Sequence, residues 1–286
     1  MKFYIKIFIC LLGIILQSAI ALAQTGFNPE YLGNAAGVKG AGFCLKTFLS
    51  YFYQNPISAH DIEMAFEPQV FIPGFSGDIH KDQIQFIAHL PVGFRSQQPA
   101  GISRDSVVGI GSLAINIEHF WHIIDTKDLE MWLDHAISSG YPTATEHRGV
   151  RIGGNSFVVG AFQEFFLRYK SYLFSIMPVF IDWSFKDNET NQRAGFSMNV
   201  LNGSIGYQIF PNFAAGINFG LLLGNLAGSE DANGVKLPVS ARAYAGPAFN
   251  ISFNDNLDLQ IGGIFDVYTR QNTRGQGIFM ALWHHF

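Results

Sequence analysis

The chain has 286 residues, of which 48% are hydrophobic, 15% are aromatic and only 14% are charged. Soluble domains carry about 25% charged residues, so this chain has few groups for a water-exposed surface. With 18 Lys and Arg against 22 Asp and Glu, and with two cysteines, the composition excludes a strongly basic nucleic-acid binder and a disulfide-rich scaffold. The aromatic content also excludes an intrinsically disordered chain. A large apolar globule and a membrane protein remain.

The start of the chain is predicted to be a secretory signal peptide, residues 1–23. Two early lysines precede an apolar run over 7–16, and small residues precede a cleavage site between Ala23 and Gln24. The apolar run is short for a spanning helix, which needs about 20 residues. The mature chain 24–286 has no stretch of 18 uninterrupted apolar residues, so the sequence predicts no helical membrane span in it.

The mature chain alternates apolar and polar residues with a period of two. In 239–253 the odd positions from Val239 to Phe253 are apolar, and most even positions are polar or small. A helix would scatter these residues around its axis, so the pattern predicts a strand. Several such segments exceed the about 5–6 residues of soluble strands and reach the about 9–11 that cross a bilayer. A soluble β-sandwich or a lipocalin-like barrel would also alternate, but it should carry more charge.

Twelve strands are predicted in chain order, and they define an all-β fold, a transmembrane antiparallel up-and-down β-barrel. The expected ranges are 42–53, 63–72, 82–95, 107–121, 129–141, 154–168, 172–185, 196–210, 213–226, 239–253, 257–270 and 276–286. The connections alternate between tight turns and longer polar stretches, as they do in outer-membrane barrels. The tight turns lie at 169–171, 211–212 and 254–256, and the longer stretches at 142–153, 186–195 and 227–238. An even strand number places both termini in the periplasm.

The last strand carries a pattern that resembles the signal read by the outer-membrane insertion machinery. The chain ends on an aromatic residue, and the residues at every second position before it share its face: Ile278, Met280, Leu282, His284 and Phe286. His284 stands where that signal prefers Tyr. We therefore expect the barrel insertion machinery and outer-membrane lipid as partners, and a location in the outer membrane of a Gram-negative bacterium.

Six short motifs resemble, in their order, landmarks of the outer-membrane transporter family of the meta-pathway of phenol degradation. They are Gly109-Ile110-Gly111-Ser112, Tyr141-Pro142-Thr143-Ala144, Gly153-Gly154-Asn155, Gly206-Tyr207, Ala245-Gly246-Pro247 and Arg274-Gly275-Gln276-Gly277. Ser112 replaces the family's Asp, and Ala144 replaces its Gly. The resemblance implies an outer-membrane transporter. It also favours a strand before the second motif, where 126–139 could otherwise form a helix capped by Thr126.

The alternation assigns six charged residues to the inside of the barrel, three of each sign: Lys46, Arg242, Arg270, Glu118, Asp258 and Asp266. They either pair and brace the barrel or line a path for solutes. Apolar residues are also assigned inward: Phe174, Ile176 and Phe180, on one face with Asp182, and Phe279 and Trp283 on the last strand. Such residues either suit hydrophobic solutes or fill the interior, because twelve strands lie between filled barrels of about 8 and open ones of 16–18.

The sequence offers little that indicates an enzyme. His119 and His122 lie three apart, and His284 and His285 are adjacent, so on a strand each pair points to opposite sides. A Gly-x-Ser-x-Gly elbow is absent from the sequence. We therefore predict no catalytic residue, no metal and no cofactor. The expected function is a passive channel for small hydrophobic, including aromatic, molecules, without nucleic acid as a partner. A structural or surface-interaction barrel with a closed lumen and an outer-membrane hydrolase are the alternatives.

Overall fold

The computed structural model describes residues 42–55, 58–98, 104–143, 145–147, 150–152, 156–187, 192–271 and 274–286. The predicted signal peptide with its Ala23–Gln24 cleavage site lies outside the described residues, and so does the Gly153-Gly154-Asn155 motif. Within the described part of the chain, no helix is long and apolar enough to span a membrane.

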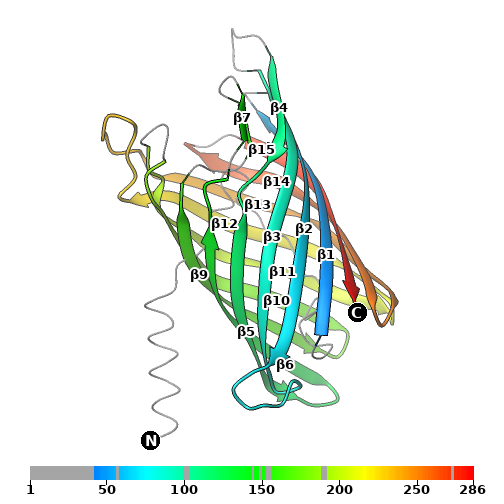
Figure 1. Ribbon diagram of the computed structural model, residues 1–286. Helices are drawn as coiled ribbons and strands as arrows, with labels where there is room; N and C mark the ends of the chain where they lie inside the picture. Colours follow the sequence, from blue (N-terminus) through cyan, green and yellow to red (C-terminus); the bar gives the residue numbers. More distant parts are fainter. Residues whose placement is uncertain are drawn as a thin grey trace, which may run out of the picture.

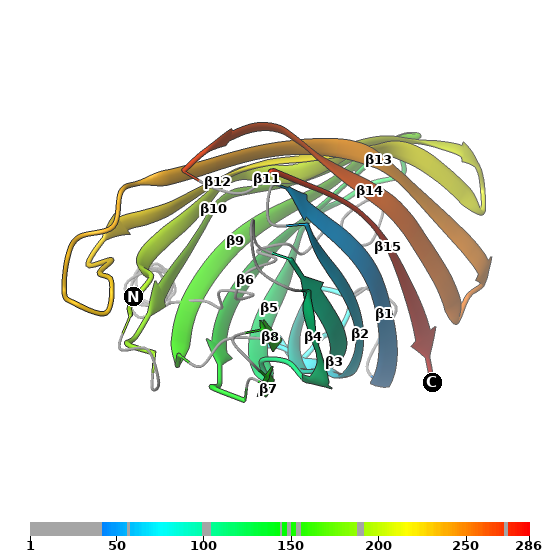
Figure 2. The same ribbon diagram turned by 90° about the horizontal axis from the view of Figure 1, so that it is seen from above.

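Twelve long strands form a closed antiparallel barrel (Figures 1 and 2). They are β1 (Gly42–Asn55), β2 (Ala59–Pro73), β3 (Asp82–Gln97), β5 (Ala114–Asp125), β6 (Leu129–Gly140), β9 (Val158–Tyr169), β10 (Tyr172–Ser184), β11 (Gly195–Phe210), β12 (Phe213–Ala227), β13 (Ser240–Asn254), β14 (Leu257–Arg270) and β15 (Arg274–His285). Neighbours pair in the order β10-β11-β12-β13-β14-β15-β1-β2-β3-β5-β6-β9, and β9 packs along β10 to close the ring. The predicted twelve-stranded barrel is confirmed.

Alternation along each strand separates an apolar outer surface from a buried inner one. On β1, Leu49 is 41% exposed whereas Phe48 beside it is 8% exposed. Large apolar side chains are exposed all round the barrel, which is the surface that lipid requires. They include Leu49, Tyr51, Ile62, Met64, Phe86, Val92, Ile117, Ile137, Ile205, Ile217, Phe249, Ile261, Phe265, Ile278 and Met280.

The segment that could have been a helix is strand β6. It pairs with β5 on one side and with β9 on the other, which satisfies its backbone groups through neighbouring strands. Thr126, the candidate helix cap, instead closes the β5–β6 turn. Its backbone N–H donates to the Leu129 carbonyl at 2.9 Å, and the Leu129 N–H donates to the Thr126 hydroxyl at 3.1 Å. The strand prediction at 129–141 is therefore confirmed.

The single strand predicted over 107–121 is wrong, because residues 111–113 interrupt it. The first part is the separate strand β4 (Asp105–Ile110), which pairs with the distal half of β3, Val92–Gln97. The second part is β5, which pairs with the proximal half of β3. At the break the Gly111 N–H donates to the Pro91 carbonyl at 3.0 Å. The distal half of β3 therefore has β2 on one side and β4, in place of β5, on the other.

Two of the motifs that resemble the transporter family meet at this break. The Thr143 hydroxyl accepts a hydrogen bond from the Leu113 N–H at 2.7 Å and donates one to the Gly111 carbonyl at 2.7 Å. The Thr145 hydroxyl bonds both backbone groups of Ile110 in the same way, at 2.9 and 3.0 Å. The backbone groups that leave the ladder at the break are thus satisfied by two threonines from one segment.

We expect Thr143→Val to lower the free energy of unfolding by about 0.5–1.5 kcal/mol, because valine keeps the shape but removes the hydroxyl that bonds the Leu113 N–H and the Gly111 carbonyl. Urea unfolding of the refolded barrel, followed by tryptophan fluorescence, measures the change. Thr143→Ser keeps the hydroxyl and serves as the matched control. Equal stabilities of the valine and serine variants would contradict the role given to the hydroxyl.

The same segment forms a small hairpin, β7 (Thr145–His147) with β8 (Val150–Ile152), against β4. Val107, Val150 and Ile152 form a buried cluster there. A side chain on Gly93 would lie 3.3 Å from Ile152 Cγ2, so β8 covers β3 closely at this point. The hairpin therefore packs over the distal end of β3 and β4 (Figure 1).

The inward assignment of Phe174 and Ile176 is wrong, because the alternation on β10 changes phase at Pro178. Before this proline the buried residues are Leu173, Ser175 and Met177, and after it they are Asp182 and Ser184. Proline has no backbone N–H to give to the ladder. On the neighbouring strand Leu201 has a positive φ of 54°, and the β11–β12 register shifts between Val200 and Gly203. One irregularity thus crosses both strands and turns Phe174 and Ile176 away from the interior.

The tight turns lie together at one end of the barrel (Figure 1). There β9 joins β10, β11 joins β12 and β13 joins β14 through two residues each. The end of the chain is at this same end, because the Phe286 N–H donates to the Phe43 carbonyl of β1 at 2.9 Å. We call it the tight-turn end. That it faces the periplasm stays a prediction.

Candidate functional site

The candidate site is the inside of the barrel, whose inner surface combines carboxylates, amides and hydroxyls with aromatic rings. Most inward side chains are buried, including Gln83, Gln260, Glu164 and Trp132, each less than 2% exposed. Buried polar groups in proteins are normally hydrogen-bonded, and several here bond across strands, as Gln85 does to Gln69 and Ser175 to Glu164. The interior is thus closely packed at these positions.

Five of the six charged residues assigned inward are buried: Lys46, Glu118, Arg242, Asp258 and Asp266. Lys46 forms an ion pair with Glu67 of β2, and Arg242 Nε lies 2.6 Å from Asp266 Oδ1. Asn116 donates to Glu118 Oε1 at 3.4 Å, and His285 Nε2 lies 3.9 Å from Asp258. Arg270 is exposed at the end of β14, where it pairs with Ala241 of β13. That these residues line a solute path stays a prediction.

The sequence did not predict several charged residues that are buried in the structure. Arg95 and Asp61 approach to 3.4 Å between β3 and β2, and Glu67 also meets His89, whose Nδ1 lies 2.7 Å from Glu67 Oε1. Glu164 accepts a hydrogen bond from the Ser175 hydroxyl. The polar neighbours Gln163 and Glu164 hide the alternation of β9, so the period of two could not decide which faced inward. On β6, Asp134 shares one face with Ala136 and Ser138. This alternation is interrupted along the strand, but it can be recognised in the sequence.

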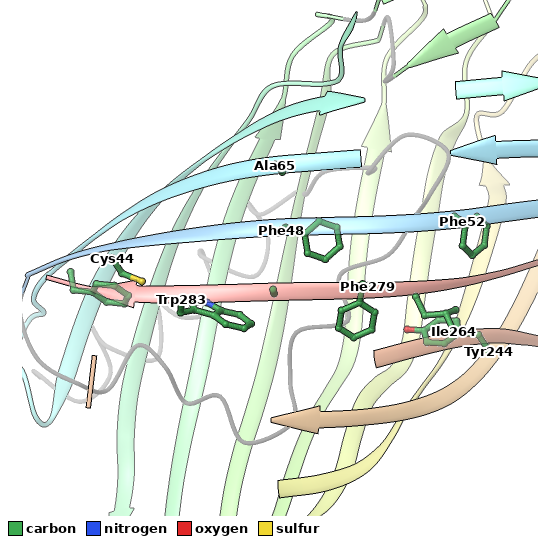
Figure 3. Packing of buried hydrophobic residues seen from close by; sticks show 10 residues of the cluster. Cys44, Phe48, Phe52, Ala65, Tyr244, Ile264, Phe279 and Trp283 are labelled. Carbon is green, nitrogen blue, oxygen red and sulfur yellow. The ribbon is translucent and has the colours of Figure 1, made fainter. Parts of the chain in front are cut away.

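Ten buried residues form a continuous apolar strip along one inner wall, and we call them the aromatic strip: Cys44, Phe48, Phe52, Ala65, Phe71, Tyr244, Ile264, Phe279, Ala281 and Trp283. Figure 3 shows Phe48 and Phe52 on β1 beside Phe279 and Trp283 on β15. Phe48 and Phe279 stack with their ring centroids 6.3 Å apart. The strip runs from Phe71 near the tight-turn end to Phe52 near the opposite end of β1.

Two cations already lie over rings of the aromatic strip. Lys46 Nζ is 5.6 Å from the centroid of Trp283 and 5.9 Å from that of Phe48. Arg242 Cζ is 4.8 Å from the centroid of Phe52. Positive groups at such distances are attracted by the ring face. The strip therefore tolerates cations as well as apolar groups.

A depression of about 690 Å³ opens at the tight-turn end. Its walls are the β11–β12 and β13–β14 turns together with Phe43, Phe71, His285 and Phe286. Phe71 also belongs to the aromatic strip. The strip thus reaches an open, solvent-accessible hollow at this end of the barrel.

The residues of the predicted insertion signal lie on the outer surface of β15 or at its end. Ile278, Met280 and Phe286 are 61%, 41% and 68% exposed, Leu282 is partly exposed and His284 is exposed. The Phe286 ring packs 4.2 Å from His284 and 5.5 Å from Phe43, measured between centroids. At these positions the side chains of the pattern are accessible from outside the barrel. That the insertion machinery recognises them stays a prediction.

The structure brings no metal-binding group together in the described ranges, where no three His, Cys, Asp or Glu side chains are placed to hold an ion. His119 stacks with His135 and meets Phe75, whereas His122 stacks on Trp132. The two histidines thus take part in different contacts.

Comparison with known proteins places this fold among the solved outer-membrane barrels. It is similar to the COG4313 outer membrane channel from Pseudomonas putida F1, with a TM-score of 0.75 and 12% identity, over 86% of this chain and 96% of that chain. It is also similar to the transport unit of the autotransporter AIDA-I from Escherichia coli, with a TM-score of 0.52 and 7% identity, over 86% and 90% of the two chains. Identities this low show the fold alone. No family model and no curated protein matches the sequence.

Proposed function

We propose that this chain is a passive outer-membrane channel for small hydrophobic molecules, including aromatic ones, and not an enzyme. The observation that carries the proposal is the aromatic strip, which follows the inner wall and reaches the hollow at the tight-turn end. Water-filled pores offer hydrophobic solutes no favourable contact, whereas rings and aliphatic groups along the wall do. The resemblance of the sequence to the phenol-degradation transporters supports the same function.

The proposal includes how the barrel sits in the membrane. Its exposed apolar side chains contact outer-membrane lipid, and the barrel insertion machinery recognises the last strand through Phe286 and the apolar residues before it. The tight-turn end faces the periplasm, because outer-membrane barrels have short periplasmic turns and longer outer loops. Solutes then enter among the longer loops and leave through the hollow beside Phe71.

A structural barrel with a closed lumen is the second candidate, and the burial of the inner side chains favours it. Trp132, Lys46 and Glu164 are each at most 1% exposed, so a solute must displace side chains to pass at their level. The two candidates differ in one measurable property, which is flux. A closed barrel braced by its ion pairs conducts nothing.

Flux through the purified barrel tests the proposed function. A heat-dependent shift between unboiled and boiled samples on a gel first shows that the protein is folded. The folded protein is then placed in planar lipid bilayers and in liposomes, and cells with and without the gene take up labelled toluene. We expect discrete conductance steps and faster uptake with the gene. A folded barrel that gives neither result would overturn the proposal in favour of the closed barrel.

A further inference from the structure

We propose that the outer surface of the barrel binds the phosphorylated headgroup of an outer-leaflet glycolipid at the end opposite the tight turns. Six residues from four neighbouring strands form the site, and we call them the arginine–tyrosine patch: Tyr51, Tyr53, His60, Tyr268, Arg270 and Arg274. The inference rests on the proposed orientation in the outer membrane. It goes beyond the channel function, because the site faces lipid and not the lumen.

A bulge in β14 turns the last residues of this strand to the outer face. The register shifts at Val267, and beyond it Tyr268 pairs with Ala243 and Arg270 pairs with Ala241. On β13 these two alanines alternate with buried residues and belong to the outward phase. Residues directly opposite each other on paired strands share a face, and a bulge re-aims the side chains that follow it. The alternation alone predicts an inward position for Arg270, and the bulge reverses it.

Residues of β15, β1 and β2 continue the patch across the sheet. Arg274 lies in the exposed phase of β15 and pairs with Asn55 of β1. On the same face, Tyr53 pairs with His60 of β2, and their ring centroids are 5.0 Å apart. The Tyr51 hydroxyl lies 2.9 Å from His60 Nδ1. The patch is thus a connected surface of guanidinium, phenol and imidazole groups over the adjacent strands β14, β15, β1 and β2.

The patch lies where the apolar outer surface of these strands ends. Toward the tight-turn end the next outward side chains are apolar and exposed, among them Phe265, Ile278, Leu49 and Ile62. Tyrosines at such a boundary lie at the level of the lipid headgroups. Acyl chains can therefore cover the apolar residues while the headgroup of the same lipid meets the patch.

The two arginines carry positive charges that no carboxylate of the described residues pairs with. Arg168, by contrast, forms an ion pair with Glu130 at the other end of the barrel. Arg274 Nε donates to the Asp266 backbone carbonyl at 3.2 Å, which holds the base of the guanidinium group against β14. Guanidinium groups bind phosphate with two parallel hydrogen bonds, so a phosphorylated headgroup is the ligand that they fit.

The outer face around the patch carries no acidic residue within the described strands from β13 to β2 in the ring. The carboxylates of these strands all belong to the inward phase: Asp61, Glu63, Glu67, Asp258 and Asp266. A phosphate group on the outer face therefore meets positive charge without a repelling carboxylate beside it.

Binding of lipid A to the folded barrel in detergent micelles tests the inference. The probes are bisphosphorylated lipid A, the same lipid without its phosphates, and inorganic phosphate as a competitor, with native mass spectrometry as the readout. We expect the phosphorylated lipid to bind at least about tenfold more tightly than the lipid without phosphates, because hydrogen bonds to charged groups are strong. The double variant Arg270→Gln with Arg274→Gln should lose this preference.

Arg168→Gln is the matched control, because Arg168 is an exposed arginine at the tight-turn end of β9. It should bind lipid A as the unchanged protein does, and a heat-dependent gel shift shows that each variant is folded. Equal binding of the two lipids, or an undiminished preference in the double variant, would overturn the inference. Displacement of lipid A by an equal concentration of inorganic phosphate would overturn it in favour of a site for free anions.

The fate of the channel function is read separately, from conductance of the same preparations. Conductance without a preference for the phosphorylated lipid would overturn the inference and leave the channel standing. Preference for that lipid in a folded barrel without conductance would support the inference and overturn the channel.

Discussion

Replacing Arg242 by methionine is expected to lower the free energy of unfolding by about 3–5 kcal/mol, the usual cost of breaking a buried ion pair. The side chains of Arg242 and Asp266 are 7% and 0% exposed, and Arg242 also covers the ring of Phe52. Without the guanidinium the Asp266 carboxylate is left in the interior with the Gly275 N–H, at 2.6 Å, and with no buried cation among the described residues shown in contact with it. Urea unfolding of the refolded barrel measures the loss.

The double variant Arg242→Met with Asp266→Asn separates the cost of the stranded charge from the loss of packing. Asparagine is neutral but keeps an oxygen that accepts the Gly275 N–H. We expect the double variant to be more stable than Arg242→Met alone. If adding Asp266→Asn instead lowered the stability further, the charge of Asp266 would not be the source of the cost.

Gly246→Ala is expected to destabilise the barrel by at least about 1–3 kcal/mol, the range of overpacking, or to prevent its assembly. A Cβ at this position would lie 1.9 Å from the Gly263 carbonyl oxygen and 2.5 Å from the carbonyl carbon. These are backbone atoms of the neighbouring strand β14, which move only if the strand pairing moves. The fraction of heat-modifiable protein in unboiled gels measures assembly, and urea unfolding measures stability.

Gly263→Ala provides the comparison for Gly246. Its Cβ would meet the Phe265 ring at 3.0 Å and the Pro247 ring at 3.3 Å, so side chains rather than backbone must give way. We expect this variant to assemble and to lose less stability. Equal losses for the two glycines would show that the close backbone approach at Gly246 is not the reason for its glycine.

Gly246 also shows how much of the candidate site the sequence can predict. The motif Ala245-Gly246-Pro247 was identified from the sequence as a family landmark. The need for glycine comes from the backbone of Gly263 on β14, and only the strand register shows that the two residues lie close together. The inward phase of β13 and β14 was predictable, because Arg242, Asp258 and Asp266 alternate with apolar residues. The ion-pair partners of the inward residues were not predictable. Lys46, for example, pairs with Glu67 of β2, and the sequence alone does not show which residues of that strand face inward.

Local irregularities limited the prediction on other strands. The break at 111–113 and the phase change at Pro178 each add or remove one residue from the period of two, which turns every later side chain to the opposite face. Phe174 and Ile176 were assigned inward for this reason. The aromatic strip shows the same dependence on tertiary structure, because its members come from β1, β2, β13, β14 and β15.

The amino-acid sequence by itself determined the strand number, the antiparallel up-and-down order and the apolar outer surface, because a period of two is a property of each strand on its own. The closure of β9 against β10, the hairpin over β4 and the gathering of the aromatic strip along one inner wall were decided only by the tertiary structure. The physical reason is that register and ring position relate residues distant in the chain, and local alternation carries no information about which strands will face each other across the barrel.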